Sequence, residues 1–315
     1  MNAVGVDYDL PPKQCKALRR ATRLEWISIA FLASIVVIMG LVMGSSQTMK
    51  AMWLEDILSI VPSCSFLVGA HFRKKKPTEA YPYGYRRAVL VGFMCGAVAL
   101  FGFGVMILFD SIMKLIRAEH ASIQTVQIFG WTVWLGWSML AALIYSVIPP
   151  FILGRMKKPL AGELHDKALH VSAALNKGDW LSGVAGVVGI LGIAYGFWWT
   201  DSAAAAFISI EIVVDGWSNL RNSIAQLMNK RPSDIETKKE DPVIDKLQKA
   251  IEQLEWVRCA RARLREDGDV LTGEVFIEPD DERDLLNRLA EARDVAKRLD
   301  WRLHDISMVP VRSVD

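Results

Sequence analysis

Six long apolar segments, separated by short polar stretches, occupy the first 230 residues of the chain. They run over about Leu24–Gly44, Met52–Phe72, Ala88–Ile116, Val126–Leu153, Ala173–Trp199 and Ser202–Leu227. A hydrocarbon core about 30 Å thick needs about 20 predominantly apolar residues to cross it as a helix. The pattern therefore predicts six transmembrane helices, and an even number places both ends of the chain on the same side of a membrane.

After Pro232 the pattern changes to that of a soluble domain. Apolar residues recur at helical spacing after Asp241, and two runs that alternate in polarity follow. The predicted elements are a helix from Asp241-Pro242, strands over Val257–Arg265 and Val270–Ile277, a helix over Asp281–Leu299 and a strand over Arg302–Val311. The order α-β-β-α-β is typical of a two-layer α+β domain with its helices on one face of the sheet.

These patterns divide the chain into four parts. We expect an N-terminal arm at 1–23, a six-helix transport domain at 24–230, a linker at 231–240 and a C-terminal dimerisation or regulatory domain at 241–315. The fold class is thus an α-helical membrane protein with a small α+β domain.

Basic residues gather on one side of the predicted bundle. The arm and the loops after the second and fourth segments are rich in Lys and Arg, whereas the opposite loops hold little beyond Lys50 and Arg117. Lys and Arg remain in the cytoplasm when a membrane protein inserts. Both termini are therefore expected in the cytoplasm, and the short loops and the lack of a targeting segment favour a bacterial inner membrane.

Composition excludes several other classes of protein. The chain has 315 residues, 52% of them hydrophobic, and a net charge of +2 that gives no reason to expect nucleic acid. The four cysteines have no CxxC spacing, so they predict neither a disulfide framework nor a zinc site. No nucleophile, base and oxyanion donor cluster together. We therefore expect neither an enzyme nor a bound cofactor.

Acidic residues stand at the head of two apolar segments. Glu55 and Asp56 precede one run, and Asp179 opens another more than a hundred residues later. A carboxylate at membrane depth costs roughly 2.5–3.5 kcal/mol on insertion scales. Two such segments predict a polar site between helices, as in a membrane transporter for a cation.

With these features the chain resembles the cation diffusion facilitators, a family of proton-coupled exporters of divalent metals. Six segments with cytoplasmic ends, an α-β-β-α-β tail and a Tyr-Pro-Tyr-Gly-Tyr loop at 81–85 carry the resemblance; the family commonly has His-Pro-Tyr-Gly there. The resemblance implies efflux of a divalent metal in exchange for protons, by a homodimer joined through the C-terminal domain.

The family's transport site uses two ligands four residues apart on the second span and two on the fifth. The resemblance places these pairs at Glu55 with Ser59 and at Leu175 with Asp179. Leu175 cannot bind a metal, and neither pair holds a histidine.

Asp56 and Asn176 are the available substitutes. A set made of Glu55, Asp56, Ser59, Asn176 and Asp179 offers oxygen donors alone. Such donors suit Mn²⁺, Mg²⁺ or Fe²⁺ better than the zinc that mixed histidine sites favour. The expected cargo is therefore of the Mn, Fe, Co or Zn class, with Mn and Fe first.

Other metal sites of the family lack their histidines here. Tyr81 and Tyr85 stand in the loop where a surface site near Glu79 would need histidines. In the tail, Cys259 and Ser307 stand near the family's ligand positions, and His304 is the one histidine. We therefore expect no surface site and no binuclear zinc cluster.

An alternative function stays open at this point. Lys177 could neutralise Asp179, and Glu55 and Asp56 could be acids at a helix N-terminus, where the dipole favours them. The chain would then be a transport-inactive scaffold or a metal sensor of the same fold.

Further polar residues have two interpretations. Glu163, His165, Asp166 and His170 could form a cytoplasmic metal-binding approach, although solvated loop residues explain them more simply. Asp110, Glu211 and Asp215 could assist proton movement or hydrogen bonds between helices.

Overall fold

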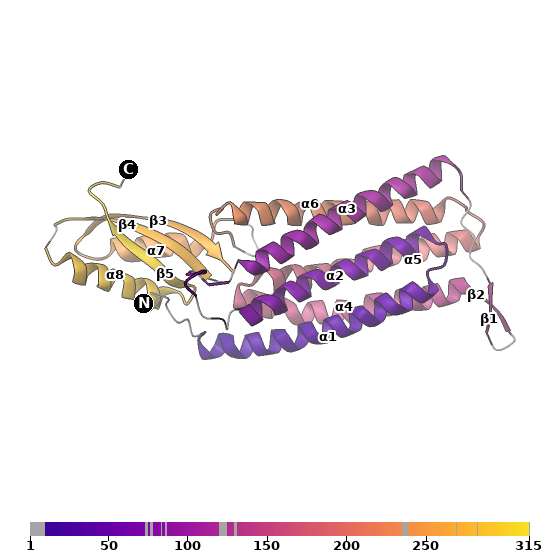
Figure 1. Ribbon diagram of the computed structural model, residues 1–315, viewed down its shortest axis with the longest axis horizontal. Helices are drawn as coiled ribbons and strands as arrows, with labels where there is room; N and C mark the ends of the chain where they lie inside the picture. The colour runs from indigo at the N-terminus through magenta and orange to yellow at the C-terminus, as the bar shows by residue number, and fades with distance from the viewer. Residues whose placement is uncertain are drawn as a thin grey trace.

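The computed structural model describes most of the chain. The described residues are 10–72, 75, 78–82, 84–85, 87–119, 125–128, 131–234, 239–268, 270–281 and 283–314. Side chains are not described at 88–89, 125–128, 131–133, 174–181 and 304. The molecule is elongated, with a helical bundle at one end and a small α+β domain at the other (Figure 1).

Within the described residues, six long helices form the bundle. They are α1 (Pro12–Val42), α2 (Gln47–Phe72), α3 (Ala88–Ile116), α4 (Leu135–Leu164), α5 (Lys167–Ala194) and α6 (Thr200–Leu227). Judged on the described residues, all except α5 are long and apolar enough to cross a membrane. In α5 the described apolar part is Ser182–Ala194. The predicted helical membrane fold is confirmed.

The helices form a four-helix group with a separate pair beside it. Helices α1 and α4 lie on one side, α2 and α5 lie in the middle, and α3 and α6 lie together on the other side (Figure 1). The pair packs closely, because a Cβ on Gly216 of α6 would come within 2.6 Å of the backbone nitrogen of Phe101 on α3. Figure 1 thus shows α2 and α5 between the two outer layers.

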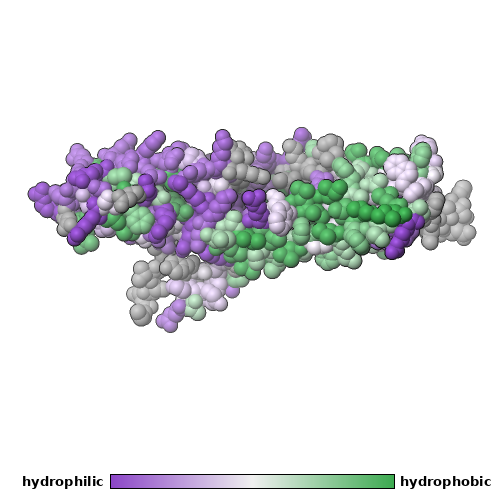
Figure 2. Space-filling model, turned by 90° about the horizontal axis from the view of Figure 1, so that it is seen from above, coloured by the Kyte–Doolittle hydropathy of each residue, from purple (hydrophilic) through white to green (hydrophobic). Residues whose placement is uncertain are grey.

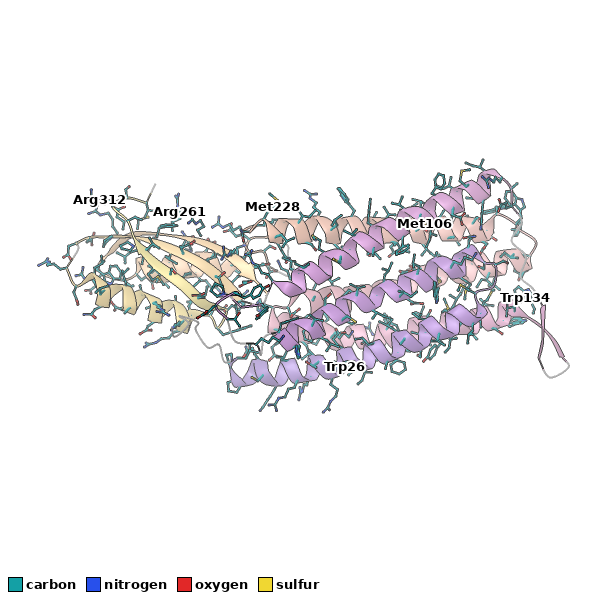
Figure 3. All side chains as sticks on the ribbon, viewed as in Figure 1. Trp26, Met106, Trp134, Met228, Arg261 and Arg312 are labelled. Atoms are coloured by element: carbon teal, nitrogen blue, oxygen red, sulfur yellow. The ribbon has the colours of Figure 1, made fainter. Side chains whose placement is uncertain are left out.

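An apolar belt covers the outside of the bundle (Figure 2). Trp26 of α1 and Met106 of α3 point away from it on opposite sides, with 61% and 67% of their surfaces exposed (Figure 3). Contiguous exposed apolar surface on this scale is unfavourable in water and is expected of a lipid-facing surface. The tail, where Arg261 and Arg312 lie, is mostly hydrophilic (Figures 2 and 3).

The predicted fourth span is wrong at both ends. Its first residues form a hairpin of β1 (Thr125–Ile128) and β2 (Trp131–Trp134), and α4 begins only at Leu135. The helix then passes through Pro149 and Pro150, where the prediction had it near its end, and continues to Leu164. Prolines are tolerated inside membrane helices because neighbouring groups satisfy the freed backbone. Lys157 therefore lies in the helix and not in a loop.

The C-terminal domain has the predicted order of elements. It contains α7 (Pro242–Glu252), β3 (Val257–Asp267), β4 (Val270–Pro279), α8 (Leu285–Leu299) and β5 (Leu303–Pro310). The strand order is β3-β4-β5, with β3 antiparallel and β5 parallel to β4. Leu247 of α7 and Ala292 of α8 pack in one core with Val275 of β4. We call residues 241–314 the tail domain, and the two ends of the bundle the tail end and the hairpin end.

Ion pairs join the tail domain to the bundle. Lys167 of α5 lies 2.6 Å from Glu266 Oε2, and the backbone N–H of Ser233 donates to Glu266 Oε1 at 3.1 Å. Arg87, just before α3, lies 3.5 Å from Asp267. A cavity of about 310 Å³ opens beside these contacts, lined by α2, α3, α5, α6 and the tail domain.

His165 contributes to the same junction. It ends α4 in the left-handed conformation, with φ of 50°, and its ring lies edge-on to Trp301 with centroids 6.4 Å apart. Burial lowers the pKa of His165, and the nearby Arg302 guanidinium lowers it further against the opposing pull of Asp300 and Asp241. The folded junction therefore favours the neutral imidazole.

We expect this junction to weaken in mild acid. Because the folded-state pKa of His165 is lowered, its contribution is complete above the unfolded value of about 6.5 and is lost as the pH falls below it. Hydrogen exchange, corrected for intrinsic rates, should show less protection at 164–168 and 300–303 at pH 5.5 than at pH 7.5. His165→Asn, which tolerates the left-handed conformation, should abolish the difference; an equal difference in the variant would contradict the assignment.

Candidate metal site

The start of α2 is fixed by a residue of α6. The carboxylate of Asp201, which is fully buried, accepts from Ser46 Oγ at 2.6 Å, from the Gln47 N–H at 2.7 Å and from the Thr48 N–H at 3.2 Å. Thr48 Oγ1 donates back to the Asp201 carbonyl at 2.8 Å. The first N–H groups of a helix lack partners within it, so Asp201 caps α2 from the neighbouring helix. Asp201 is not among the residues predicted from the sequence.

Glu55 lies roughly two turns into α2 and faces the other central helix. Ser182 Oγ of α5 lies 3.2 Å from Glu55 Oε1 and 3.2 Å from Glu211 Oε2 of α6. A hydroxyl has one hydrogen to donate, so it can satisfy only one of the two carboxylates at a time. The arrangement is rich in acceptors and suits a bound cation or proton. We call Glu55, Asp56, Ser182 and Glu211 the acidic cluster.

Asp56 and Ser59 extend this polar region into the bundle. Asp56 is 6% exposed, and its Oδ2 is one of the described buried oxygens without a hydrogen-bond partner. Ser59 follows on the next turn of α2 and is also buried. An ionised carboxylate in an apolar interior is strongly disfavoured unless it is paired, bound to metal or protonated. Asp56 is therefore a second buried carboxylate beside Glu55 that a bound cation or a proton would stabilise.

For the predicted partners on α5, the structure describes the backbone only. The helix backbone covers Leu175, Asn176, Lys177 and Asp179, but the side chains of all four lie outside the described residues. Residues three apart share a helix face, so position 179 falls on the face that carries Ser182. The predicted contributions of Asn176 and Asp179, and the proposed neutralisation by Lys177, stay predictions. Within the described residues no three His, Cys, Asp or Glu side chains are grouped closely enough to hold a metal.

One alternative interpretation of the acids is wrong. Glu55 and Asp56 are not acids at a helix N-terminus, because α2 begins at Gln47 and has no acid in its first turn. Both acids thus lie well inside the helix, where the helix dipole gives a carboxylate little stabilisation.

The other candidate residues have local partners. Asp166 caps α5 by accepting from the Leu169 N–H at 3.0 Å, and Glu163 lies 3.5 Å from Lys13. Asp110 lies 3.5 Å from Lys114, one turn further along α3. Cys259 lies beside Glu252, and the His304 side chain is outside the described part of the tail domain.

Sequence reasoning missed two parts of the buried polar network. Ser182 carries no signal of its own beyond sharing a helix face with Asp179. Glu25 and Lys157, assigned to the edge of a span and to a loop, form an ion pair of 2.9 Å in which both side chains are fully buried. The one sequence signal for this ion pair is that each charged residue stands within a few positions of a predicted apolar segment.

Comparison with known proteins finds similarity to cation efflux proteins over most of the chain. A family model described as the cation efflux transmembrane domain matches residues 25–228. The manganese efflux system protein MneP of Bacillus subtilis is 22% identical over 295 residues, which cover 89% of this chain and 92% of MneP.

Two further relatives match shorter stretches. An uncharacterised transporter of Methanocaldococcus jannaschii is 23% identical over 66% of this chain and 69% of its own length. The magnetosome protein MamB of a Magnetospira strain is 22% identical over 58% of this chain and 60% of its own length. The family match spans well over half of the chain, and it coincides with the helices that carry the acidic cluster. The chain therefore belongs to the cation diffusion facilitator family, whose members are efflux transporters for divalent metal ions.

Proposed function

We propose that the protein exports Mn²⁺ or Fe²⁺ from the cytoplasm across a bacterial inner membrane in exchange for protons. The observation that carries the proposal is the Ser182 hydroxyl shared by Glu55 and Glu211, which brings carboxylates of α2 and α6 to one point beside α5. Asp56 and Asp179 would complete the cation site, with Ser59 and Asn176 as further oxygen donors. A second copy of the chain is expected to join through the tail domain.

The choice of metal follows from the donor chemistry. The described side chains of the site offer carboxylate and hydroxyl oxygens, which hold Mn²⁺ and Mg²⁺ well, whereas zinc sites in proteins favour nitrogen and sulfur. The name of MneP describes manganese efflux for that protein, which agrees with this order. Manganese is therefore the first cargo to test, with iron second.

The proton exchange follows from the cost of buried charge. When the metal leaves, several carboxylates would remain within the bundle without a cation, and protonation is the cheapest way to discharge them. Protons that enter from the outer side would thus reset the site. The Lys and Arg residues of the N-terminal arm and of the sequence after the second apolar segment support an orientation with both termini in the cytoplasm.

Flux measurements test the metal assignment. Proteoliposomes containing the full chain should move Mn²⁺ and Fe²⁺ at least tenfold faster than Zn²⁺, with Co²⁺ between, because the site lacks the nitrogen donors that zinc favours. Ser182→Ala should slow Mn²⁺ flux by about 10-fold, since outer-shell partners of ligands are worth 10–100-fold in metal affinity. Ser209→Ala is the matched control, because Ser209 Oγ donates to its own helix, to the Ala205 carbonyl at 2.7 Å. Faster Zn²⁺ than Mn²⁺ flux would overturn the metal choice, and metal binding without any flux would favour a sensor.

A further inference from the structure

One face of α1 changes from basic to apolar side chains partway along the helix. The exposed cations at its start are Lys13, Lys16, Arg19, Arg20 and Arg23. The exposed apolar residues that follow are Trp26, Ile27, Phe31, Val37, Ile38 and Leu41. Spacings of three and four residues keep side chains on one helix face, so both groups share that face. We call the five cations the basic stripe.

The opposite face of α1 packs into the bundle. Ala17 and Ala21 are buried in an apolar cluster with Phe66 of α2 and Ala161 of α4. One turn further along, Glu25 accepts from Lys157 Nζ of α4 at 2.9 Å, and both side chains are fully buried. These contacts fix the rotation of α1, so the basic stripe and the apolar residues beyond it face outward together.

Aromatic residues indicate where this outward face enters the hydrocarbon. Trp26 points away from the bundle (Figure 3), and Trp137, Tyr195 and Trp199 are exposed at the hairpin end. Trp and Tyr gather at the boundary between lipid headgroups and hydrocarbon. From Trp26 to its end at Val42, α1 runs about 24 Å, close to the thickness of about 30 Å of a hydrocarbon core. Trp26 therefore marks the boundary at the tail end.

The arginines of the basic stripe lie just outside this boundary. Arg23, Arg20 and Arg19 precede Trp26 by about 5–10 Å along the helix axis. A headgroup layer is about 5–8 Å thick on each side of the hydrocarbon, and the long side chain of arginine can reach along the helix toward it. The three guanidinium groups are therefore at the depth of lipid phosphates, whereas Lys13 and Lys16 lie further out.

These arginines lack acidic partners in the part of the chain that the structure describes. Of the five cations in the basic stripe, only Lys13 has a described ion-pair partner, Glu163, at 3.5 Å. Like charges three or four residues apart destabilise a helix, and an anion between them would remove that cost. The planar guanidinium group of arginine also binds phosphate through two parallel hydrogen bonds. The stripe is thus suited to a phosphate group.

We propose that Arg19, Arg20 and Arg23 form a binding site for the headgroup of an anionic phospholipid in the leaflet at the tail end. The guanidinium groups hold the phosphate oxygens, and Ile27 and Phe31 contact the acyl chain. A lipid fits this face better than a soluble anion does, because the apolar surface begins directly beside the cations. Basic surfaces at helix ends are known to attract anionic lipids. The inference does not depend on which ion the protein transports.

Lipid binding to the full chain tests the inference. The protein in a neutral detergent is titrated with phosphatidylglycerol, and native mass spectrometry gives the Kd for the first bound lipid. Each cation near an anionic headgroup contributes about fivefold in affinity, so Arg19→Gln/Arg23→Gln should raise this Kd at least 10-fold. Phosphatidylcholine with the same acyl chains, whose headgroup has no net charge, should bind the unmodified chain and the variant equally weakly.

Two further double variants separate the site from general attraction and from the fold. Arg155→Gln/Lys158→Gln removes two exposed cations of α4 and should change the Kd less than twofold. Arg19→Lys/Arg23→Lys keeps the charges and should stay within threefold of the unmodified chain. An equal loss in the α4 variant would show diffuse attraction, and an equal loss in the lysine variant would show that charge is not the cause. Either result would overturn the inference.

A soluble anion provides the last comparison. Inorganic phosphate and chloride at equal ionic strength screen charges alike, so both should weaken phosphatidylglycerol binding to the same extent. Stronger displacement by inorganic phosphate would show that the arginines bind a free anion and would overturn the assignment to a lipid. Equal affinity of the unmodified chain for phosphatidylglycerol and phosphatidylcholine would overturn it as well.

Discussion

Glu55→Gln is expected to lower Mn²⁺ efflux at least 100-fold in proteoliposomes. The substitution keeps the size of the side chain but removes one of the charges that a divalent ion would meet between α2, α5 and α6. A 100-fold loss corresponds to about 2.8 kcal/mol, which is of the order expected when a charged group loses its role in a desolvated site. Initial rates of Mn²⁺ uptake at saturating and limiting concentrations measure the effect.

Two further variants make this test specific. Glu163→Gln is the matched control, because Glu163 forms an ion pair with Lys13, whose side chain is 80% exposed, and it should leave flux unchanged. Glu211→Gln should behave like Glu55→Gln, and the double variant should lose less than the product of the two, since both acids share the Ser182 hydroxyl. Normal flux in Glu55→Gln would refute the acidic cluster as the transport site.

Arg302→Ala is expected to destabilise the tail domain by about 3–5 kcal/mol, the range for removal of one partner from a buried ion pair. Arg302 Nη1 donates to Asp241 Oδ2 at 2.6 Å, and Nη2 donates to Asp300 Oδ2 at 3.0 Å. The variant would leave the Asp241 carboxylate, which also caps α7, buried without its cation. Hydrogen exchange of β4 in the full chain, followed through a urea titration, measures the loss.

An exposed ion pair in the same domain provides the comparison. Arg283 donates to Asp281 at 2.9 Å, but the Arg283 side chain is 88% exposed. Solvent screens such pairs, so Arg283→Ala should leave the urea midpoint of the tail domain unchanged. Equal effects of the two variants would show that the burial of Arg302 does not determine its contribution.

Hydropathy predicted the helices well because a membrane span needs only length and apolar composition. The elements of the tail domain were predicted equally well, because apolar and polar residues around Val257 and Val270 alternate with the period of a half-buried strand. The errors came where one pattern can form two structures. The apolar stretch from Val126 to Trp134 was predicted as the start of a span, but its described residues form two paired strands. Pro149-Pro150 would end a helix in water but lies inside α4 within the bundle.

The polar residues inside the bundle were harder to predict from the sequence. Glu55 and Asp56 were identified because a charge in an apolar run costs free energy, but Lys157 was predicted in a solvent-exposed loop because basic residues usually flank a span. Ser182 could not be identified, because serine is common in helices and only the fold brings it between Glu55 and Glu211. The contributions of Asn176 and Asp179, and the boundaries of the domains, stay predictions.

The hydrogen bonds between Asp201 and the start of α2 hold the first residues of α2 and α6 at the same level along the bundle. Counted from this point, Glu55 stands eight residues, about 12 Å, along α2, and Glu211 stands ten residues, about 15 Å, along α6. The two acids meet because these lengths are nearly equal. Insertion of a single residue between Asp201 and Glu211 would turn the second acid by about 100° and take it out of reach of Ser182, even though no residue of the acidic cluster had been replaced.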